Sequence, residues 1–364
     1  MRSETAAAVP GAVAPLVIDA FGVPVGVQAP DLSTRERWER LWSRALGEGQ
    51  EPAVVIEKSH LQPDAEHDQV DYTLTSRVTA AALAETKGRR WNFHACGLTD
   101  DEGRVLAMVA GAGTGKTTAS STLGRRLGYL SDETVSVGAS LDVLPYAKPL
   151  SVVVSPDEPY RKTQRSPDSL GLLPATLPAR LHRLVQLDRS TGPGRTGLDP
   201  LSLSESLAAF LPQSSFLGSF PWPLVRFVEL FEAVGGAWRL RYREIGDHAG
   251  ELLDLLAADT PAPATEWAHV APPATPPTPR RGQVVRARWD DALDLGDAVA
   301  VLISGTLYQL DGLGKTIWTA SAEPTDDEGL LRAAQEVHGD HGDAPELLRE
   351  AVTKLEMAGL LHRS

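Results

Sequence analysis

The sequence predicts an α/β (α+β) domain built on a mixed sheet, followed by a smaller α+β domain. Two observations lead to this prediction. A buried-type strand runs through a glycine-rich turn into a helix near residue 110, and a segment dense in proline and alanine separates two different patterns at 261–282. We therefore expect one domain over 1–260, a semi-extended linker over 261–282 and a second domain over 283–364.

Strands and helices are mixed along the first domain. Strand-like patterns occur at residues 53–57, 70–74, 91–98, 104–109, 134–138, 151–154 and 238–242. Helical spacing occurs at residues 76–86, 117–127, 201–210 and 223–234. Because helices do not regularly separate the strands, we expect the sheet to be mixed rather than parallel throughout.

The second domain has its strands first and its helices last. Strands are expected at 284–289, 298–303 and 306–310, with Ser304-Gly305 as a tight turn, and helices at 312–318, 327–337 and 344–357. This order in about 80 residues resembles a winged helix. In the linker before it, Trp267 and Val270 are the residues able to dock on a neighbouring element.

Charge and composition argue against several function classes. The 364 residues include 35 basic and 48 acidic side chains, a net charge of −13, which disfavours nonspecific binding to nucleic acid or to an anionic membrane. The single cysteine, Cys96, allows no internal disulfide, favours a cytoplasmic location and is expected to be buried. Prolines interrupt the apolar stretch 6–18, so no signal peptide is expected, and no apolar run reaches the roughly 20 residues of a membrane span.

The segment Val105–Thr118 carries the strongest functional pattern. Its glycine-rich turn allows successive backbone N–H groups to face one anion, and the helix that follows adds its positive N-terminal end. We expect ATP phosphates to bind there, with Lys116 reaching the β- and γ-phosphates and the Thr117 hydroxyl helping to hold Mg²⁺. The expected nucleotide-binding residues are Gly111, Ala112, Gly113, Thr114, Gly115, Lys116, Thr117 and Thr118.

Two departures qualify this motif. Ala110 stands where the pattern usually has its first glycine, a replacement that is often seen. A second Gly-Lys-Thr occurs at 314–316, but Gln309 occupies the position of its first glycine, so we expect a turn into a helix there and no second nucleotide site.

Motifs on both sides of the loop narrow the chemistry. His94 lies in Trp91–Gly97 before the loop; Asp132 and Glu133 lie in Gly128–Ser136 after it, and Leu144–Ser151 then contains Lys-Pro-Leu. This order resembles the HPr kinase/phosphorylase family, whose kinase core is similar to phosphoenolpyruvate carboxykinase. The resemblance covers residues 15–260, with its specific motifs at 91–151.

The resemblance implies roles for individual residues. It implies that Asp132 assists deprotonation of an acceptor serine and contacts Mg²⁺, that Glu133 occupies a second metal position where aspartate is usual, and that His94 lies near the phosphates. The expected catalytic residues are thus Asp132, His94 and Lys116, and the expected metal ligands are Thr117, Asp132 and Glu133. Lys148 matches a lysine of the family's Lys-Pro stretch.

Structural alternatives stay open for each of these residues. His94 fits an ordinary strand histidine, Asp132-Glu133 a solvated strand end, and Lys148 a surface charge. Asp188, in the stretch Leu184–Asp188 that loosely fits a Walker B strand, is a rival metal ligand. Arg189, Arg239, Arg241 and Arg243 are further candidates for phosphate contact, although alternating arginines on a strand more often mark an exposed face.

Residues 284–364 resemble the PqqD-like family of RiPP recognition elements, through the stretch Ala300–Trp318 and the final Val352–Leu361. The resemblance implies that a leader peptide adds a strand to the edge of the sheet and packs on the last helix. Trp318 and Tyr308 are expected in the core, and His338 and His341 in a loop without a metal.

Together these features predict an ATP- and Mg²⁺-dependent kinase that phosphorylates a Ser or Thr hydroxyl of a ribosomally made precursor peptide. Two alternatives remain: a nucleotide-gated leader-peptide carrier without transfer chemistry, and a regulatory HPr-type kinase or phosphorylase acting on a folded protein. Glu133 slightly favours the carrier, whereas Lys116, Thr117 and Asp132 favour transfer. Homo-oligomerisation, known in the resembled kinase family, is left open.

Overall fold

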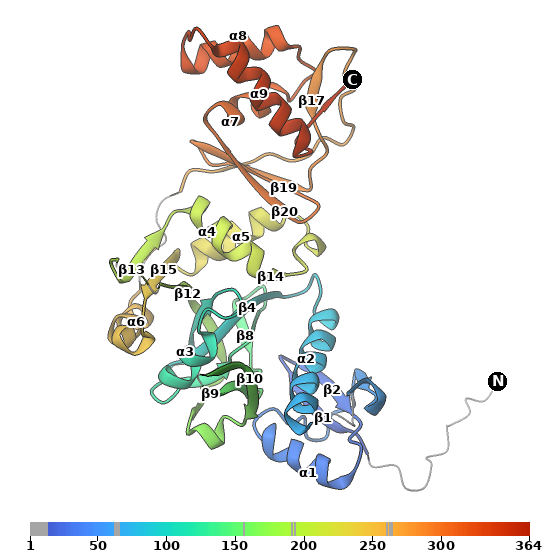
Figure 1. Ribbon diagram of the computed structural model, residues 1–364, viewed down its shortest axis with the longest axis vertical. Coiled ribbons are helices and arrows are strands. Elements are labelled where there is room, and N and C mark those ends of the chain that lie inside the picture. The colour runs from blue at the N-terminus through green and yellow to red at the C-terminus, as the bar shows by residue number, and fades with distance from the viewer. Residues whose placement is uncertain are drawn as a thin grey trace, which may run out of the picture. The chain divides into compact units, whose positions relative to one another are not determined.

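The chain divides by its backbone contacts into two compact units. The computed structural model describes residues 14–364 except 62–65, 156, 191, 193, 260 and 262–264 (Figure 1). The first unit comprises the described residues of 1–200, 213–216 and 237–260, and the second those of 201–212, 217–236 and 261–364. No helix in these described parts is both long and apolar enough to cross a bilayer.

A small sheet with two helices opens the first unit. The strands β1 (Leu16–Ala20) and β2 (Val23–Val27) are antiparallel, and β3 (Val54–Ile56) pairs with β2 in parallel. The helices α1 (Leu32–Leu41) and α2 (His67–Glu85) bury apolar side chains against this sheet. The core between them contains Trp38, Trp42 and Tyr146, all fully buried.

The large mixed sheet of the first unit carries the glycine loop. Its main path runs β11-β6-β4-β7-β8-β12-β15-β13, with β5 paired to β4 and β12, and β14 paired to β4. The strands are β4 (Trp91–Thr99), β5 (Arg104–Val109), β6 (Gly128–Ser131), β7 (Thr134–Val137), β8 (Asp142–Leu144), β11 (Leu173–Pro174), β12 (Ala179–Arg189), β13 (Gly197–Leu201), β14 (Ser214–Ser215) and β15 (Ala237–Tyr242). Since β5, β12 and β15 run parallel, their carboxyl ends lie at one edge.

Two helices and a hairpin complete this unit. Helices α3 (Lys116–Leu123) and α6 (Ala249–Ala257) share one hydrophobic core with β5 and β12. The strands β9 (Leu150–Ser155) and β10 (Glu158–Arg165) form a separate antiparallel pair. The predicted mixed sheet is therefore confirmed, and so are most of the predicted elements.

One predicted strand was wrong. Residues 70–74 lie inside α2, because Val70, Leu74 and Val78 recur every four residues and face the core. The strand was predicted because apolar residues alternate at positions 70, 72 and 74. Tyr72, however, is 46% exposed on the opposite face of the helix. The predicted helix at 117–127 is also shorter, since α3 ends at Leu123 with Gly124 as its C-cap.

The second unit contains a four-stranded antiparallel sheet in the order β16-β18-β19-β20. Its strands are β16 (Ala268–His269), β18 (Asp291–Asp294), β19 (Ala298–Ile303) and β20 (Thr306–Asp311). The helices are α4 (Leu203–Phe210), α5 (Pro223–Ala233), α7 (Gly312–Ala320), α8 (Asp327–His338) and α9 (Ala344–Met357). Strand β17 (Val284–Arg286) pairs separately with β21 (Leu361–Arg363).

Three details of this unit differ from the sequence predictions. The strand predicted at 284–289 ends at Arg286 and pairs with β21 rather than joining the main sheet. The described part of the predicted linker contains β16, and Val270 donates a backbone hydrogen bond to Ala292, so the docking expected of this segment is confirmed. Residues 201–212 and 217–236, placed before the predicted boundary at 260, group with the second unit.

The buried side chain of Asp291 explains why α5 belongs with the second unit. Its Oδ2 accepts hydrogen bonds from the backbone N–H groups of Leu224 (2.7 Å) and Val225 (3.4 Å), in the first turn of α5. Its Oδ1 lies 2.9 Å from Nε2 of His269 on β16. One carboxylate on β18 thus caps a helix and fixes the linker strand.

We predict that Asp291→Ala destabilises the second unit by about 1–3 kcal/mol, because buried N–H groups lose their acceptor. Urea unfolding followed by tryptophan fluorescence measures this. The matched control is Asp297→Ala, at an exposed position between β18 and β19, for which we expect a change within about 0.5 kcal/mol. Equal stability of the two variants would show that Asp291 does not join these elements.

Candidate functional site: a glycine loop beside a buried ion pair

The fold places the glycine loop between β5 and α3, as the sequence predicted. Two loop glycines have the left-handed backbone that favours glycine, Gly113 with φ 78° and Gly115 with φ 103°. A Cβ atom on Gly115 would lie only 2.7 Å from the hydroxyl of Tyr242, so this position also lacks room for a side chain. Ala110 has no positive φ, which explains why a side chain is tolerated where the usual motif has glycine.

The side chain of Lys116 folds back onto the loop. Its Nζ donates hydrogen bonds to the carbonyl oxygens of Ala110 (2.7 Å) and Gly111 (2.9 Å). Burial lowers the pKa of Lys116, although the nearby carboxylates oppose this effect. The ammonium is therefore held at the loop itself, where it can exchange carbonyl partners for phosphate oxygens.

Asp132 directly follows β6 in sequence. It is buried beside the first turn of α3 and is surrounded by hydrogen-bond donors. Its Oδ2 accepts from the hydroxyl of Thr117 at 3.1 Å, and its Oδ1 accepts from the hydroxyl of Tyr129 at 3.3 Å. Nζ of Lys148 lies 3.1 Å from the same Oδ1. The solvated strand end considered as an alternative is excluded for Asp132, because the residue is only 4% exposed.

Lys148 is a buried counterion rather than a surface charge. Its Nζ bridges Asp132 and Glu133, at 3.1 Å from each carboxylate, and donates to the carbonyl of Pro149 at 2.9 Å. Burial by itself would lower the pKa of Lys148, but the two carboxylates outweigh it and raise that pKa. The lysine thus bridges two neighbouring carboxylates from a buried position.

His94 lies on β4, next to the beginning of the loop. Its backbone carbonyl accepts from the N–H of Ala110 at 3.4 Å. Burial and then the positive charge of Lys116 lower the pKa of the half-buried imidazole, which favours its neutral form near pH 7. A neutral ring can donate to or accept from a phosphate oxygen or a water.

Tyr129 and Tyr242 are site residues that the sequence analysis missed. The hydroxyl of Tyr242, at the end of β15, donates to the carbonyl of Thr114 in the loop at 2.6 Å. Burial raises the pKa of Tyr242 to about 12, so its hydroxyl remains a donor. The only sequence signal for Tyr242 was its position at the end of β15, since the parallel strands β5 and β12 end at the same edge of the sheet.

The rival acid Asp188 has another partner. It is half exposed, and its Oδ2 lies 3.8 Å from Nε of Arg241. Arg241 also pairs with Asp199, and Arg189 pairs with Glu244 at 3.1 Å. These arginines are thus largely engaged with acids of the same edge, whereas Asp132 contacts the hydroxyl of the loop helix directly.

The residues present are compatible with a magnesium ion bound together with a nucleotide. Among the described residues, no group of three or more His, Cys, Asp or Glu is placed to hold a metal alone. Mg²⁺ usually takes one or two protein ligands and completes its shell with phosphate oxygens and water. The hydroxyl of Thr117 and the carboxylate of Asp132, 3.1 Å apart, match that requirement. Glu133 is turned to Lys148, so its predicted metal role lacks a comparable contact.

The remaining candidate residues have structural roles. Cys96 is fully buried, and burial raises its pKa to about 12, so it is not a reactive thiol. In the second Gly-Lys-Thr, Lys315 pairs with Asp294 at 2.6 Å, and Thr316 bonds His338 at 2.9 Å. Trp318 is buried in the core, as predicted.

No family model matches this chain, and no curated protein matches it in sequence. The interpretation of the site therefore depends on its geometry and on the motif order.

We predict that Lys148→Met destabilises the first unit by about 3–5 kcal/mol, because the buried carboxylate of Asp132 loses its ion-pair partner. Chemical unfolding at pH 7 measures the loss. Lys162→Met, at an exposed position on β10, is the matched control and should change stability by less than about 0.5 kcal/mol. A loss no larger than that of the control would mean that the ion pair contributes nothing to the fold.

Proposed function

We propose that this chain is an ATP- and Mg²⁺-dependent kinase that transfers the γ-phosphoryl group to a Ser or Thr hydroxyl of a ribosomally made precursor peptide. The observation that carries the proposal is the position of the Asp132 carboxylate, which is bonded to Thr117 in the first helical turn after the glycine loop. The order of motifs, which resembles HPr kinase/phosphorylase, supports the same reaction class.

The chain's own residues supply most of what phosphoryl transfer requires. The N–H groups of the glycine loop and the ammonium of Lys116 would bind the phosphates of ATP and offset the charge on the transferred group. Mg²⁺, bound by Thr117 and Asp132 with the phosphates, would neutralise further charge. His94 would contact the phosphates as a neutral ring.

Asp132 has a second role in the proposed step. Its carboxylate accepts the proton of the acceptor hydroxyl as the oxygen attacks the γ-phosphorus, while the bond to the β-γ bridging oxygen breaks and ADP leaves. Lys148 is a positioning residue in this scheme, because its ammonium, 3.1 Å from Oδ1, fixes the direction of the Asp132 carboxylate. Tyr129 restrains the same oxygen of Asp132.

The second unit would hold the peptide, as its resemblance to PqqD-like domains implies. Within the described sheet, β18 already has β16 on its outer side, whereas β20 pairs only with β19. A leader peptide would add as a further strand to β20. Tethering the acceptor in this way would raise its effective concentration near the nucleotide.

The direct test is transfer from ATP and Mg²⁺ to short precursor peptides encoded beside this gene, measured by intact mass. We predict a gain of one phosphoryl group, with a rate lowered by about 10²–10⁴-fold in Asp132→Asn. In Lys116→Ala, ATP turnover should be lost while peptide binding survives.

Asp188→Asn is the matched control, because it removes the rival carboxylate. Activity lost in Asp188→Asn and retained in Asp132→Asn would reassign the metal and base roles. Nucleotide and peptide binding without any change in mass would contradict the kinase and favour the nucleotide-gated carrier.

A further inference from the structure

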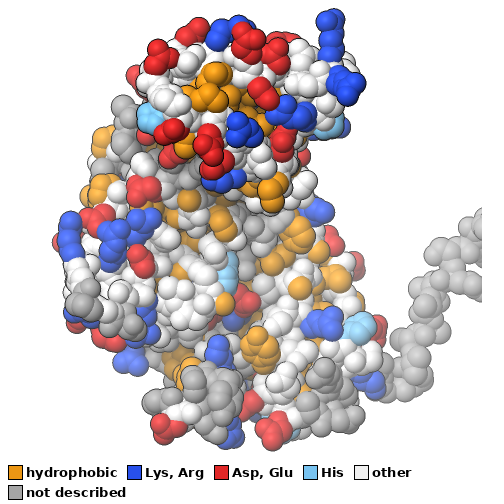
Figure 2. Space-filling view, turned by 45° about the horizontal axis from the view of Figure 1, so that its top comes forward, with side chains coloured by type: hydrophobic (Ala, Val, Ile, Leu, Met, Phe, Trp, Pro, Cys, Tyr) orange, Lys and Arg blue, Asp and Glu red, His pale blue; other side chains and the backbone are white. Residues whose placement is uncertain are grey.

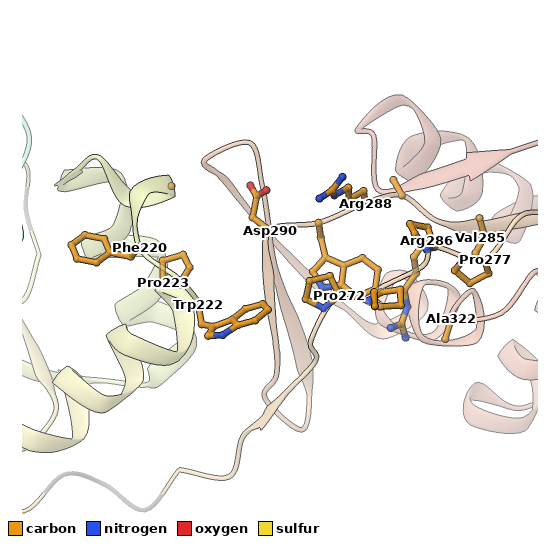
Figure 3. A pocket seen from close by; sticks show the side chains of 16 residues that line it. Phe220, Trp222, Pro223, Pro272, Pro277, Val285, Arg286, Arg288, Asp290 and Ala322 are labelled. Atoms are coloured by element: carbon orange, nitrogen blue, oxygen red, sulfur yellow. The ribbon is translucent and has the colours of Figure 1, made fainter. Parts of the chain in front are cut away.

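A cavity of about 390 Å³ lies within the second unit, apart from the sheet edge assigned to the leader peptide. Its walls come from the residues just before and at the start of α5, the proline-rich segment after β16, and the segment joining β17 to β18 (Figure 3). Aromatic and proline side chains dominate it, among them Phe220, Trp222, Trp289, Pro272 and Pro277. We call it the tryptophan–arginine cavity. A volume of a few hundred Å³ and a mainly apolar lining are typical of a site for a small ligand or a short peptide.

Arg286 gives this apolar cavity a positive charge. Its guanidinium lies 3.7 Å from the ring centre of Trp318 and 5.7 Å from that of Trp289. Its Nε donates to the carbonyl of Trp318 at 2.7 Å, and its Nη2 to that of Thr319 at 3.1 Å. These bonds leave Nη1 without a protein acceptor in the described part of the chain.

No carboxylate in the described ranges lies within ion-pair distance of Arg286. Burial lowers the pKa of its guanidinium to about 10, with no acid opposing the shift. The acid at the cavity wall, Asp290, instead accepts a hydrogen bond from the N–H of Ser304 at 2.6 Å. A partly buried cation is usually paired with an acid of the same protein, and acids are abundant in this chain of net charge −13. The guanidinium of Arg286 is therefore available to an anionic ligand.

Trp222 is held in an unusual conformation at the other end of the cavity. Its φ of 50° is left-handed, and the residue remains 42% exposed while its ring packs edge-on against His269 at 4.9 Å. Trp289 is tied to the proline-rich segment, because its Nε1 donates to the carbonyl of Val270 at 3.0 Å. Backbone strain retained at an exposed aromatic residue is typical of binding sites.

The cavity wall also suits an extended peptide. The backbone N–H groups of Arg288 and Trp289 donate no hydrogen bond to any part of the chain that the structure describes. A planar guanidinium binds a carboxylate with two parallel hydrogen bonds, and the aromatic walls accept an apolar neighbour.

We propose that the tryptophan–arginine cavity binds a peptide segment in which an Asp or Glu adjoins an apolar residue, with the carboxylate on Arg286. That the occupant belongs to the substrate peptide rests on the proposed function; the carboxylate preference does not. The site would thus read a short acidic–apolar element of the precursor, in addition to the strand added to β20.

The test uses the full chain without nucleotide and two probes, acetyl-Leu-Glu-Leu-amide and its Gln counterpart. The Kd of each peptide, and the tryptophans it contacts, are measured by titration from the shifts of the indole N–H signals in ¹H–¹⁵N spectra. We expect shifts at Trp222 and Trp289, and binding of the Glu peptide about tenfold tighter or more. Equal Kd values for the two peptides in the wild-type chain would overturn the proposal. Glutarate that binds as tightly as the Glu peptide would also overturn it, since the site would then take a small acid.

Variants locate the preference within the cavity. Arg286→Met keeps an apolar stem and should abolish the preference for Glu, whereas Arg332→Gln, an exposed arginine on α8, should retain it. Trp222→Ala should weaken the binding of both peptides to a similar degree. If near-ultraviolet circular dichroism shows that Arg286→Met is unfolded, Trp222→Ala is the variant that locates binding at this cavity. A preference that persists in folded Arg286→Met, or that only Trp222→Ala abolishes, contradicts the assignment. Because no ATP is present, failed phosphoryl transfer and failed carboxylate recognition are separate results.

Discussion

The ammonium of Lys148, buried between Asp132 and Glu133, is the interaction on which the candidate site depends. Asp132 is only 4% exposed, so its carboxylate depends on polar partners within the fold rather than on water. Lys148 supplies the positive charge among those partners. The large sheet, the turn after β6 and the segment before β9 serve to bring these groups to the start of α3.

A second constraint concerns the loop itself. The left-handed glycines and the bond from Tyr242 to Thr114 fix the loop before any ligand arrives, so that little ordering remains to be done on binding. Lys116 is the exception, because under the proposed function its ammonium would leave the carbonyls of Ala110 and Gly111 to bind a phosphate. On the face shown in Figure 2, acidic and basic side chains are interspersed.

Local patterns predicted the loop and most of the elements correctly, because a strand, glycine turn and helix are specified by neighbouring residues. The same reasoning failed for residues 70–74, where an alternating pattern is equally compatible with one face of a helix. Lys148 and Tyr242 could not be assigned from sequence, since their partners come from distant segments whose approach only the sheet order determines. Likewise, a proline-rich stretch gave no sign that it lines a cavity, because its period matches neither helix nor strand.

Binding of ATP in the presence and absence of Mg²⁺, measured by calorimetry in the wild-type chain and in Asp132→Asn, tests the central claim most directly. The account predicts that Mg²⁺ strengthens ATP binding to the wild-type chain and that Asp132→Asn loses this enhancement while still binding ATP through the loop. An enhancement of equal size in both proteins, or no ATP binding by the wild-type chain, would contradict it.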